Sequence, residues 1–277
     1  MTDKTPHYDL LIRGGTVIDG TKAPRFDADV GIVGGRIAAI GKLTGHTADQ
    51  TLDATGRIVA PGFIDSHTHD DRYLLLDPDM PAKLSQGVTT VVTGNCGISL
   101  APWGAPAGTA VPPPLNLLGH DPALFGDATF AAYLARLEVA PATVNAACLV
   151  GHTTLRAATM ERLDRAATPE EIARMRALLG EAMASGAIGL STGAAYPTAM
   201  PATTEEMAQV AEVIGPYGGV YASHIRDEGD HVLAALDEAF AIGRAAQAPV
   251  VVSHHKLIGP RNHGRSVQTL AHVRQAM

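Results

Sequence analysis

Cysteine and aromatic residues are scarce in this sequence of 277 residues. Its two cysteines, Cys96 and Cys148, are too few for a disulfide framework, and they favour a reducing compartment, the cytoplasm. Aromatic residues make up 4% of the chain, whereas hydrophobic residues as a whole make up 46%. These proportions exclude a disordered chain and predict a core built mainly from Ala, Val, Leu and Ile.

The sequence also has no long apolar run and no excess of basic charge. No stretch reaches the roughly 18 apolar residues that a transmembrane helix needs, so no membrane contact is predicted. The formal net charge is −7, whereas nucleic-acid-binding proteins present a basic surface, so nucleic acid is excluded as a partner. Residues 1–8 are polar and of mixed charge, unlike a secretory signal.

Residues 1–60 predict a small β unit. Residues 9–18 and 29–40 are rich in Ile, Val and Leu and are interrupted by glycines, a pattern typical of strands and turns. Residues 56–59 predict a further short strand. Because no helical periodicity is present, we expect a β-sandwich-like unit here.

From residue 61 onwards, predicted strands and helices alternate. The strands are expected at residues 63–65, 89–92, 145–150, 188–190, 220–222 and 250–252. The helices are expected at residues 129–137, 169–184, 204–214, 231–246 and 267–275. This alternation predicts a parallel sheet, and polar residues at the strand ends are typical of a (β/α)₈ barrel. Residues 61–277 therefore predict an α/β barrel of the TIM type, of which about six of eight strands are present. Residues 101–126, rich in Pro and Gly, predict a long loop that is functional or mobile.

The first candidate metal ligands are His67 and His69, directly after the strand predicted at residues 63–65. Residues two apart in an extended segment point to the same side, so both imidazoles can face one ion. Zinc accepts histidine nitrogens in this way. An isolated His-X-His pair is as often two ordinary polar residues at a strand end, so the pair alone does not establish a metal site.

Three further residues strengthen the prediction of a metal site. Cys96 lies in a glycine-flanked turn after the second predicted barrel strand, and a thiolate is a strong zinc ligand. Cys148, inside an apolar strand, has instead the position of an ordinary buried cysteine. His224 and His254 end the fifth and sixth strands. Either could be a core histidine, but their equivalent positions favour one shared metal site.

These motifs resemble those of the N-acyl-D-amino-acid deacylases, or D-aminoacylases, of the amidohydrolase superfamily. The similarity extends along nearly the whole sequence. The motifs that show it are Pro61-Gly62-Phe63-Ile64-Asp65 before the histidine pair, Gly94-Asn95-Cys96-Gly97, residues 151–156, residues 191–193, and His224 with Arg226 and Glu228. The cysteine motif is the most specific of them, because most members of the superfamily have a carboxylated lysine at that place.

The resemblance implies roles for these residues. Cys96, His224 and His254 would hold a tightly bound zinc, and His67 and His69 would form a second, weaker position. Tyr196 and Lys256 match substrate-contacting positions, with Lys256 near the substrate carboxylate. Asp65 would support the metal ligands, and a role as catalytic base is its less favoured alternative.

The implied reaction is the zinc-dependent hydrolysis of a small-molecule N-acyl-D-amino acid to a D-amino acid and a carboxylic acid. Two alternatives remain at this point: a hydantoinase-like cyclic amidase, which Cys96 argues against, and an inactive fragment that only binds metal. Family members are longer and place their catalytic aspartate after an eighth strand, which this sequence lacks. We therefore assign no catalytic base and expect the sequence to be incomplete at its C-terminus. Open strand edges would then favour self-association.

Overall fold

The structure, a computed structural model, describes residues 6–277. Residues 1–5, part of the polar segment noted above, lie outside the described residues. The chain divides into two compact units, residues 1–63 and residues 64–277, and each is described by itself. The sequence had suggested a division after residue 60, and the extent of each domain stays a prediction.

The first unit is a β-sheet in the order β3-β2-β1-β4, with β5 paired to β1. Its strands are β1 (His7–Val17), β2 (Phe26–Val33), β3 (Arg36–Gly41), β4 (Thr47–Asp53) and β5 (Ile58–Val59). Residues 29–40 form parts of two strands, because the chain turns at Gly34-Gly35, the glycines that interrupt this segment. Both glycines have positive φ angles, 57° and 72°, which glycine adopts without strain, and β2 and β3 pair antiparallel across this turn.

The second unit contains the predicted barrel strands in consecutive order. They pair as β6-β7-β8 and as β9-β10-β11-β12. Their bounds are β6 (Phe63–Asp65), β7 (Val88–Thr93), β8 (Asn145–Cys148), β9 (Val150–Gly151), β10 (Gly189–Gly193), β11 (Val220–His224) and β12 (Val250–Val252). The single strand expected at residues 145–150 is interrupted at Leu149, whose N–H bonds to the carbonyl of Thr93. The pairs with assigned register from β7 onwards are parallel, as the sequence predicts.

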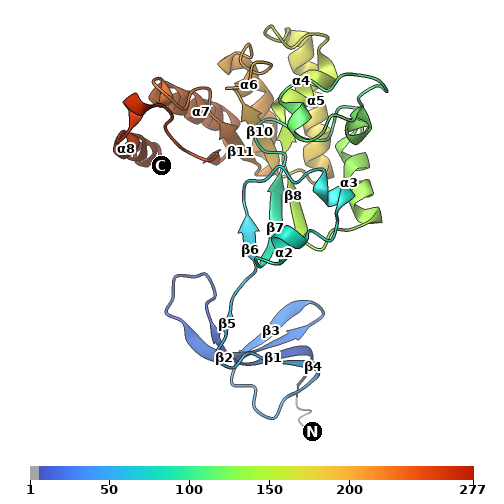
Figure 1. Cartoon of the computed structure of the whole chain (residues 1–277), viewed down its shortest axis with the longest axis vertical. Coiled ribbons are helices and arrows are strands. Elements are labelled where there is room, and N and C mark those ends of the chain that lie inside the picture. The colour runs from blue at the N-terminus through green and yellow to red at the C-terminus, as the bar shows by residue number, and fades with distance from the viewer. Residues whose placement is uncertain (1–5) are drawn as a thin grey trace. The chain divides into compact units, whose positions relative to one another are not determined.

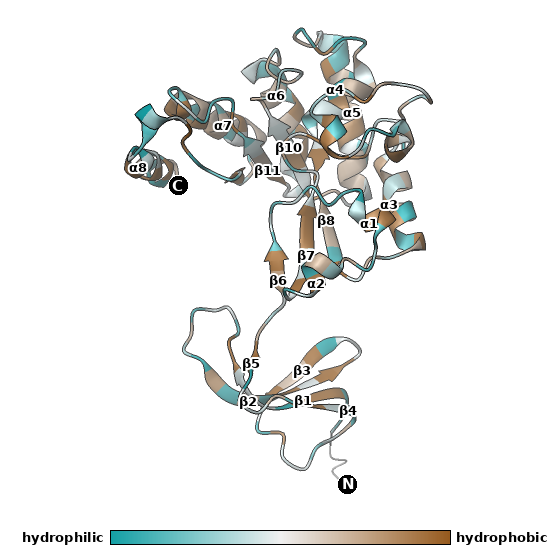
Figure 2. Ribbon diagram, viewed as in Figure 1, coloured by the Kyte–Doolittle hydropathy of each residue, from teal (hydrophilic) through white to brown (hydrophobic). Residues whose placement is uncertain are grey.

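Helices follow the strands of this unit in alternation. The longer ones are α3 (Phe130–Val139), α4 (His152–Thr159), α5 (Pro169–Ser185), α6 (Thr204–Ala211), α7 (Val232–Ala246) and α8 (Ser266–Ala276). Figure 1 shows α3, α5, α6 and α7 on the outer side of the strands, and Figure 2 shows the apolar character of β6 and β7. Each helix within residues 6–277 is too short or too polar to span a lipid bilayer.

Two helical predictions need correction. The helix expected at residues 204–214 is α-helical only to Ala211 and continues as the 3₁₀ helix η3 (Glu212–Tyr217). Pro216 lies inside this segment and has no N–H for a helical hydrogen bond. Helix α4 was not predicted at all, because its buried residues include Thr153, Thr154 and Arg156 rather than an apolar stripe.

The long loop predicted at residues 101–126 is present, with two short 3₁₀ helices, η1 (Leu115–Leu117) and η2 (Pro122–Phe125). Leu115, Leu118 and Phe125 are fully buried in the main hydrophobic cluster. The ring of Trp103 packs against Phe125 at a centroid distance of 5.2 Å. The loop is therefore anchored to the core by its own apolar side chains.

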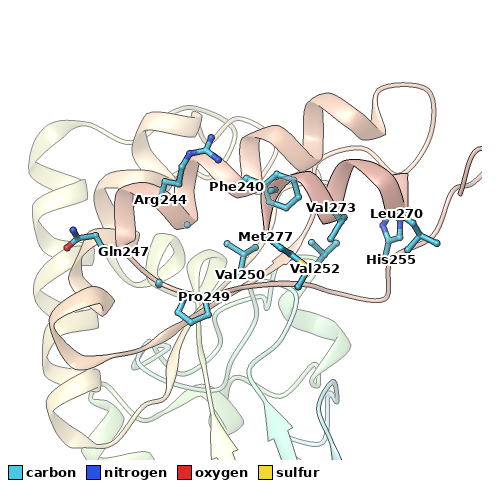
Figure 3. Close-up of a pocket in the computed structure, with 13 residues that line it drawn as sticks. Phe240, Arg244, Gln247, Pro249, Val250, Val252, His255, Leu270, Val273 and Met277 are labelled. Carbon is cyan, nitrogen blue, oxygen red and sulfur yellow. The ribbon is translucent and has the colours of Figure 1, made fainter. Parts of the chain in front are cut away.

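An apolar pocket of about 690 Å³ lies between α7, β12 and α8. Figure 3 shows Phe240, Val250, Val252 and Val273 around it. None of the candidate metal ligands lines this pocket. It therefore belongs to the edge of the sheet at β12 rather than to the chemistry described next.

Candidate metal centre

The segment with His67 and His69 leaves β6 and runs beside β7. The N–H and the hydroxyl of Thr68 both donate to the carbonyl of Val92, at 3.0 Å and 2.9 Å. Thr68 is buried, so its side chain points away from the two histidines that flank it. The imidazoles of His67 and His69 lie edge to face, with ring centroids 5.6 Å apart.

Cys96 lies in a turn that follows β7 and depends on glycine. Gly94, Cys96 and Gly97 have φ angles of 73°, 54° and 76°, in the left-handed region that favours glycine. A Cβ atom on Gly94 would lie 2.0 Å from the carbonyl oxygen of Leu149. The N–H of Gly97 donates to the hydroxyl of Ser191 at 2.9 Å. The turn is thus held closely against β9 and β10, and it buries Cys96 to 1% exposure.

His224 and His254 come from the ends of neighbouring strands. His224 is the last residue of β11, and His254 follows β12 with a φ angle of 35°. Their ring centroids are 4.4 Å apart, and the rings of His67 and His254 are 4.9 Å apart. Because the carboxyl ends of parallel strands meet at one edge, residues distant in sequence come together here.

The closest set of possible ligand atoms is formed by His67, Cys96 and His254. The Sγ atom of Cys96 lies 3.3 Å from Nε2 of His67 and 3.4 Å from Nε2 of His254. A second set joins His224 and His254 with Glu228. Within each set all ligand atoms lie within 4.8 Å of one another. The structure therefore brings four of the predicted ligands into two sets that share His254, whereas His69 is in neither set.

The electrostatics of these residues fit a bound cation. Burial and, to a smaller extent, the neighbouring histidines lower the pKa of His67 to about 4. Burial also lowers the pKa of His224 to about 4, although Glu228 acts in the opposite direction. Burial raises the pKa of the Cys96 thiol to about 12, against a hydrogen bond from Tyr196. Neutral imidazoles offer lone pairs, and a cation would stabilise the thiolate that burial alone disfavours.

Unpartnered nitrogen atoms provide a further indication that the residues fit a metal. Nδ1 of His69 and Nδ1 of His224 are buried and have no hydrogen-bond partner among the described residues. A buried polar atom without a partner is costly, and metal coordination would satisfy it. With one thiol and several imidazoles, the donor set matches the preference of zinc for sulfur and nitrogen.

Glu228 was not predicted as a site residue, although its motif with His224 and Arg226 was part of the resemblance. Its Oε1 atom lies 3.1 Å from Nδ1 of His254 and 3.8 Å from Nε2 of His224. The same oxygen accepts a hydrogen bond from Nζ of Lys256. The side chain of Glu228 is 9% exposed, so this carboxylate is a buried partner of three candidate residues.

The other predicted residues surround this cluster. The ring of Tyr196 lies 5.0 Å from that of His224, and burial raises the pKa of its hydroxyl to about 12. The side chain of Lys256 is 47% exposed, which leaves its ammonium group accessible to a ligand. The carboxylate of Asp65 accepts a hydrogen bond from the N–H of His67 at 3.4 Å through Oδ1 and pairs with Nζ of Lys83 at 2.7 Å through Oδ2. Lys83 carried no sequence signal.

Comparisons with known proteins find one family model and several similar proteins. Residues 50–272 match the model of the amidohydrolase family. D-aminoacylase from Alcaligenes xylosoxydans xylosoxydans is 57% identical over 276 residues, which is 100% of this chain and 56% of that protein.

Two solved structures are also similar. A crystal structure of D-aminoacylase has a TM-score of 0.93 at 57% identity, covering 98% of this chain and 56% of that one. N-acyl-D-glutamate deacylase from Bordetella bronchiseptica, solved with zinc and a phosphonate inhibitor, has a TM-score of 0.91 at 46% identity with the same coverage. The chain thus spans about half the length of the relatives it matches.

Proposed function

Because this chain belongs to the amidohydrolase family, we propose that it provides the metal centre of an enzyme that hydrolyses N-acyl-D-amino acids to a D-amino acid and a carboxylic acid. The main support is the position of Cys96 beside the imidazoles of His67 and His254. A cysteine at this place is the feature that resembles the deacylases most specifically. It favours a linear N-acyl-D-amino acid over the cyclic ureide of the alternative function.

The proposed metal is zinc. Cys96, His224 and His254 hold one ion tightly, and His67 and His69 offer a second, weaker position beside it. A thiolate with two imidazoles suits zinc better than two imidazoles alone. The small distances between the four imidazole rings, and between the sulfur atom and two of them, support an arrangement in which the two positions are adjacent.

When bound, zinc supplies a Lewis acid that polarises the amide carbonyl and activates water. The residues of the chain orient the reactants. Oε1 of Glu228 lies 3.1 Å from Nδ1 of His254, and Nζ of Lys256 lies 3.0 Å from the same nitrogen. These two side chains orient the imidazole, whose Nε2 lies beside Cys96. Lys256 binds the substrate carboxylate through its exposed ammonium group, and Tyr196 contacts the substrate beside His224.

Stereoselective ligand binding tests this function. The zinc-loaded chain should bind a phosphonate analogue of N-acetyl-D-methionine at least tenfold more tightly than its L enantiomer, as measured by isothermal titration calorimetry. Lys256→Met should weaken binding of the D form by removing the partner of its carboxylate. Cys96→Ser should lose most of the zinc, as determined by elemental analysis.

Two results would contradict the proposal. Equal affinity for both enantiomers would exclude selectivity for D-amino acids. Unchanged zinc content in Cys96→Ser would exclude Cys96 as a ligand of the tightly bound ion. Lys42→Met provides a control, since Lys42 is exposed in the first unit and should leave both measurements unchanged.

A further inference from the structure

Lys83 places a positive charge beside the histidine pair. It lies in the short helix α2 (Pro81–Leu84), and its side chain is only 22% exposed. The Nζ atom lies 2.7 Å from Oδ2 of Asp65 and 3.0 Å from Oδ2 of Asp70. One ammonium group, with three donors, therefore pairs with two carboxylates.

The two carboxylates stand on either side of the imidazoles in the chain. Asp65 precedes His67 by two residues, and Asp70 directly follows His69. Their side chains are 35% and 17% exposed, so water screens them only in part. Without a counter-charge they would repel each other and be attracted to any nearby dication. Carboxylate oxygens are themselves metal ligands, so they would compete with the imidazoles.

Strand β7 fixes both the histidine segment and the lysine. Thr68, between the two histidines, bonds to the carbonyl of Val92 in β7. Helix α2 also packs against β7. Because both elements are held by the same strand, the ammonium group has a defined position relative to His67 and His69. The ammonium group of Lys83 pairs with the carboxylates of Asp65 and Asp70 rather than with the imidazoles.

We propose that Lys83 is a positioning residue of the metal centre. It holds the carboxylates of Asp65 and Asp70 away from the metal position, so that this segment offers imidazole nitrogens rather than carboxylate oxygens. The inference rests on the metal centre proposed above. It adds a determinant of metal preference, because imidazole suits zinc whereas carboxylate suits manganese and magnesium.

Metal selectivity tests this role. The affinities of the metal-free chain for Zn²⁺ and Mn²⁺ would be measured by competition with a chelating dye. Lys83→Met, which keeps the length of the side chain but not its charge, should raise the Mn²⁺ affinity relative to Zn²⁺ by about tenfold. Lys83→Arg, which keeps the charge, should stay close to the wild-type ratio. Lys42→Met is the control for loss of a lysine elsewhere.

A triple variant separates the role of the carboxylates from a general structural effect. Lys83→Met combined with Asp65→Asn and Asp70→Asn removes all three charges and should return the Mn²⁺ to Zn²⁺ ratio to that of the wild type. If Lys83→Met is folded by circular dichroism and its ratio is unchanged, the inference is wrong. It is equally wrong if the altered ratio persists in the triple variant. Failure of the proposed metal centre would look different, because the wild type would then bind no zinc that depends on Cys96.

Discussion

The side chain of Glu228 connects two loops of the second unit. The loop after β11 contains Glu228, and the loop after β12 contains its partners His254 and Lys256. A further hydrogen bond joins the N–H of Ile258 to the carbonyl of Glu228 at 2.8 Å. The two loops are thus connected through side chain and backbone. The orientation of His254, a proposed ligand, depends on Glu228, which the sequence did not predict as a ligand.

Asp71 is the most deeply buried carboxylate near the centre. It is 2% exposed, and its Oδ1 accepts a hydrogen bond from the N–H of Gly94 at 3.1 Å. Its Oδ2 atom has no hydrogen-bond partner among the described residues. Burial raises the pKa of Asp71 to about 7, although the bond from Gly94 opposes the shift. Below about pH 7 the folded protein therefore favours the protonated, neutral carboxyl group.

This shift predicts a pH dependence of stability. The unperturbed pKa of the carboxyl group is 3.8, so between about pH 4 and pH 7 the folded state binds more protons than the unfolded state. The contribution of Asp71 to the free energy of unfolding is present below this range and is lost as the pH rises through it. The loss is at most roughly 1.4 kcal/mol per pH unit. Asp71→Asn cannot ionise and should gain free energy of unfolding relative to the wild type over this range.

Urea unfolding at several pH values measures the effect as the difference between variant and wild type. The exposed Asp77 provides a matched control, and Asp77→Asn should show no comparable rise between pH 4 and pH 7. A flat difference for Asp71→Asn would mean that its carboxyl group is charged in the folded protein throughout.

Helix α5 shows how an element is fixed at its beginning. The hydroxyl of Thr168 accepts a hydrogen bond from the N–H of Glu171 at 3.3 Å, and the Glu171 carboxylate accepts one from the N–H of Thr168 at 2.8 Å. This capping box satisfies two backbone donors that the helix cannot pair. Arg165 also pairs with Glu171, so the end of the helix is connected to the preceding loop.

Removal of the cap should destabilise the second unit. Thr168→Val keeps the size of the side chain but loses the hydroxyl, and we expect a decrease of about 1 kcal/mol in the free energy of unfolding in urea. Thr168→Ser keeps the hydroxyl, so its free energy of unfolding should decrease clearly less than that of Thr168→Val. Equal losses in the two variants would show that the hydroxyl does not stabilise the helix.

The elements differ in how far the sequence predicts them. The barrel strands are apolar and β-branched, so β7, β11 and β12 are found within about two residues. Strand β4, with the sequence TADQTLD, is mostly exposed and has no hydrophobic pattern to identify it. Helices α1 (Tyr73–Leu76) and α2 are single turns, too short to show a period. Local pattern therefore finds buried elements and misses exposed or short ones.

The same reasoning explains which candidate site residues the sequence could suggest. His67, His69 and Cys96 belong to short motifs that can be recognised in one segment. Glu228 and Lys83 act through partners far away in the sequence, and no local pattern shows that Lys83 meets both Asp65 and Asp70. Such pairs depend on the order of strands in the sheet, which only the folded chain reveals.

At the scale of the whole molecule, β12 leaves an open edge. Within residues 6–277 it pairs with β11 and is the last strand of its sheet. Val251 in this strand is 45% exposed, and the apolar pocket of Figure 3 lies beside it. Unpaired backbone groups next to apolar side chains favour association with another chain.

We therefore expect the isolated 277-residue chain to self-associate. Light scattering should give a mass above that of the monomer at micromolar concentrations, and Val251→Lys, which places a charge on the edge, should lower it. Val139→Lys is a suitable control, because Val139 is exposed at the end of α3. A monomeric wild-type chain would show that this edge is protected in solution.

The meeting of His67 and His254 across the second unit has a consequence for biosynthesis. His67 emerges from the ribosome long before His254, because nearly the whole second unit is synthesised between them. A nascent chain can therefore not assemble the full set of proposed ligands until residue 254 has emerged and the intervening strands have paired. Tight zinc binding would then occur only after this region has been translated. It would indicate that β12 has taken its place in the sheet.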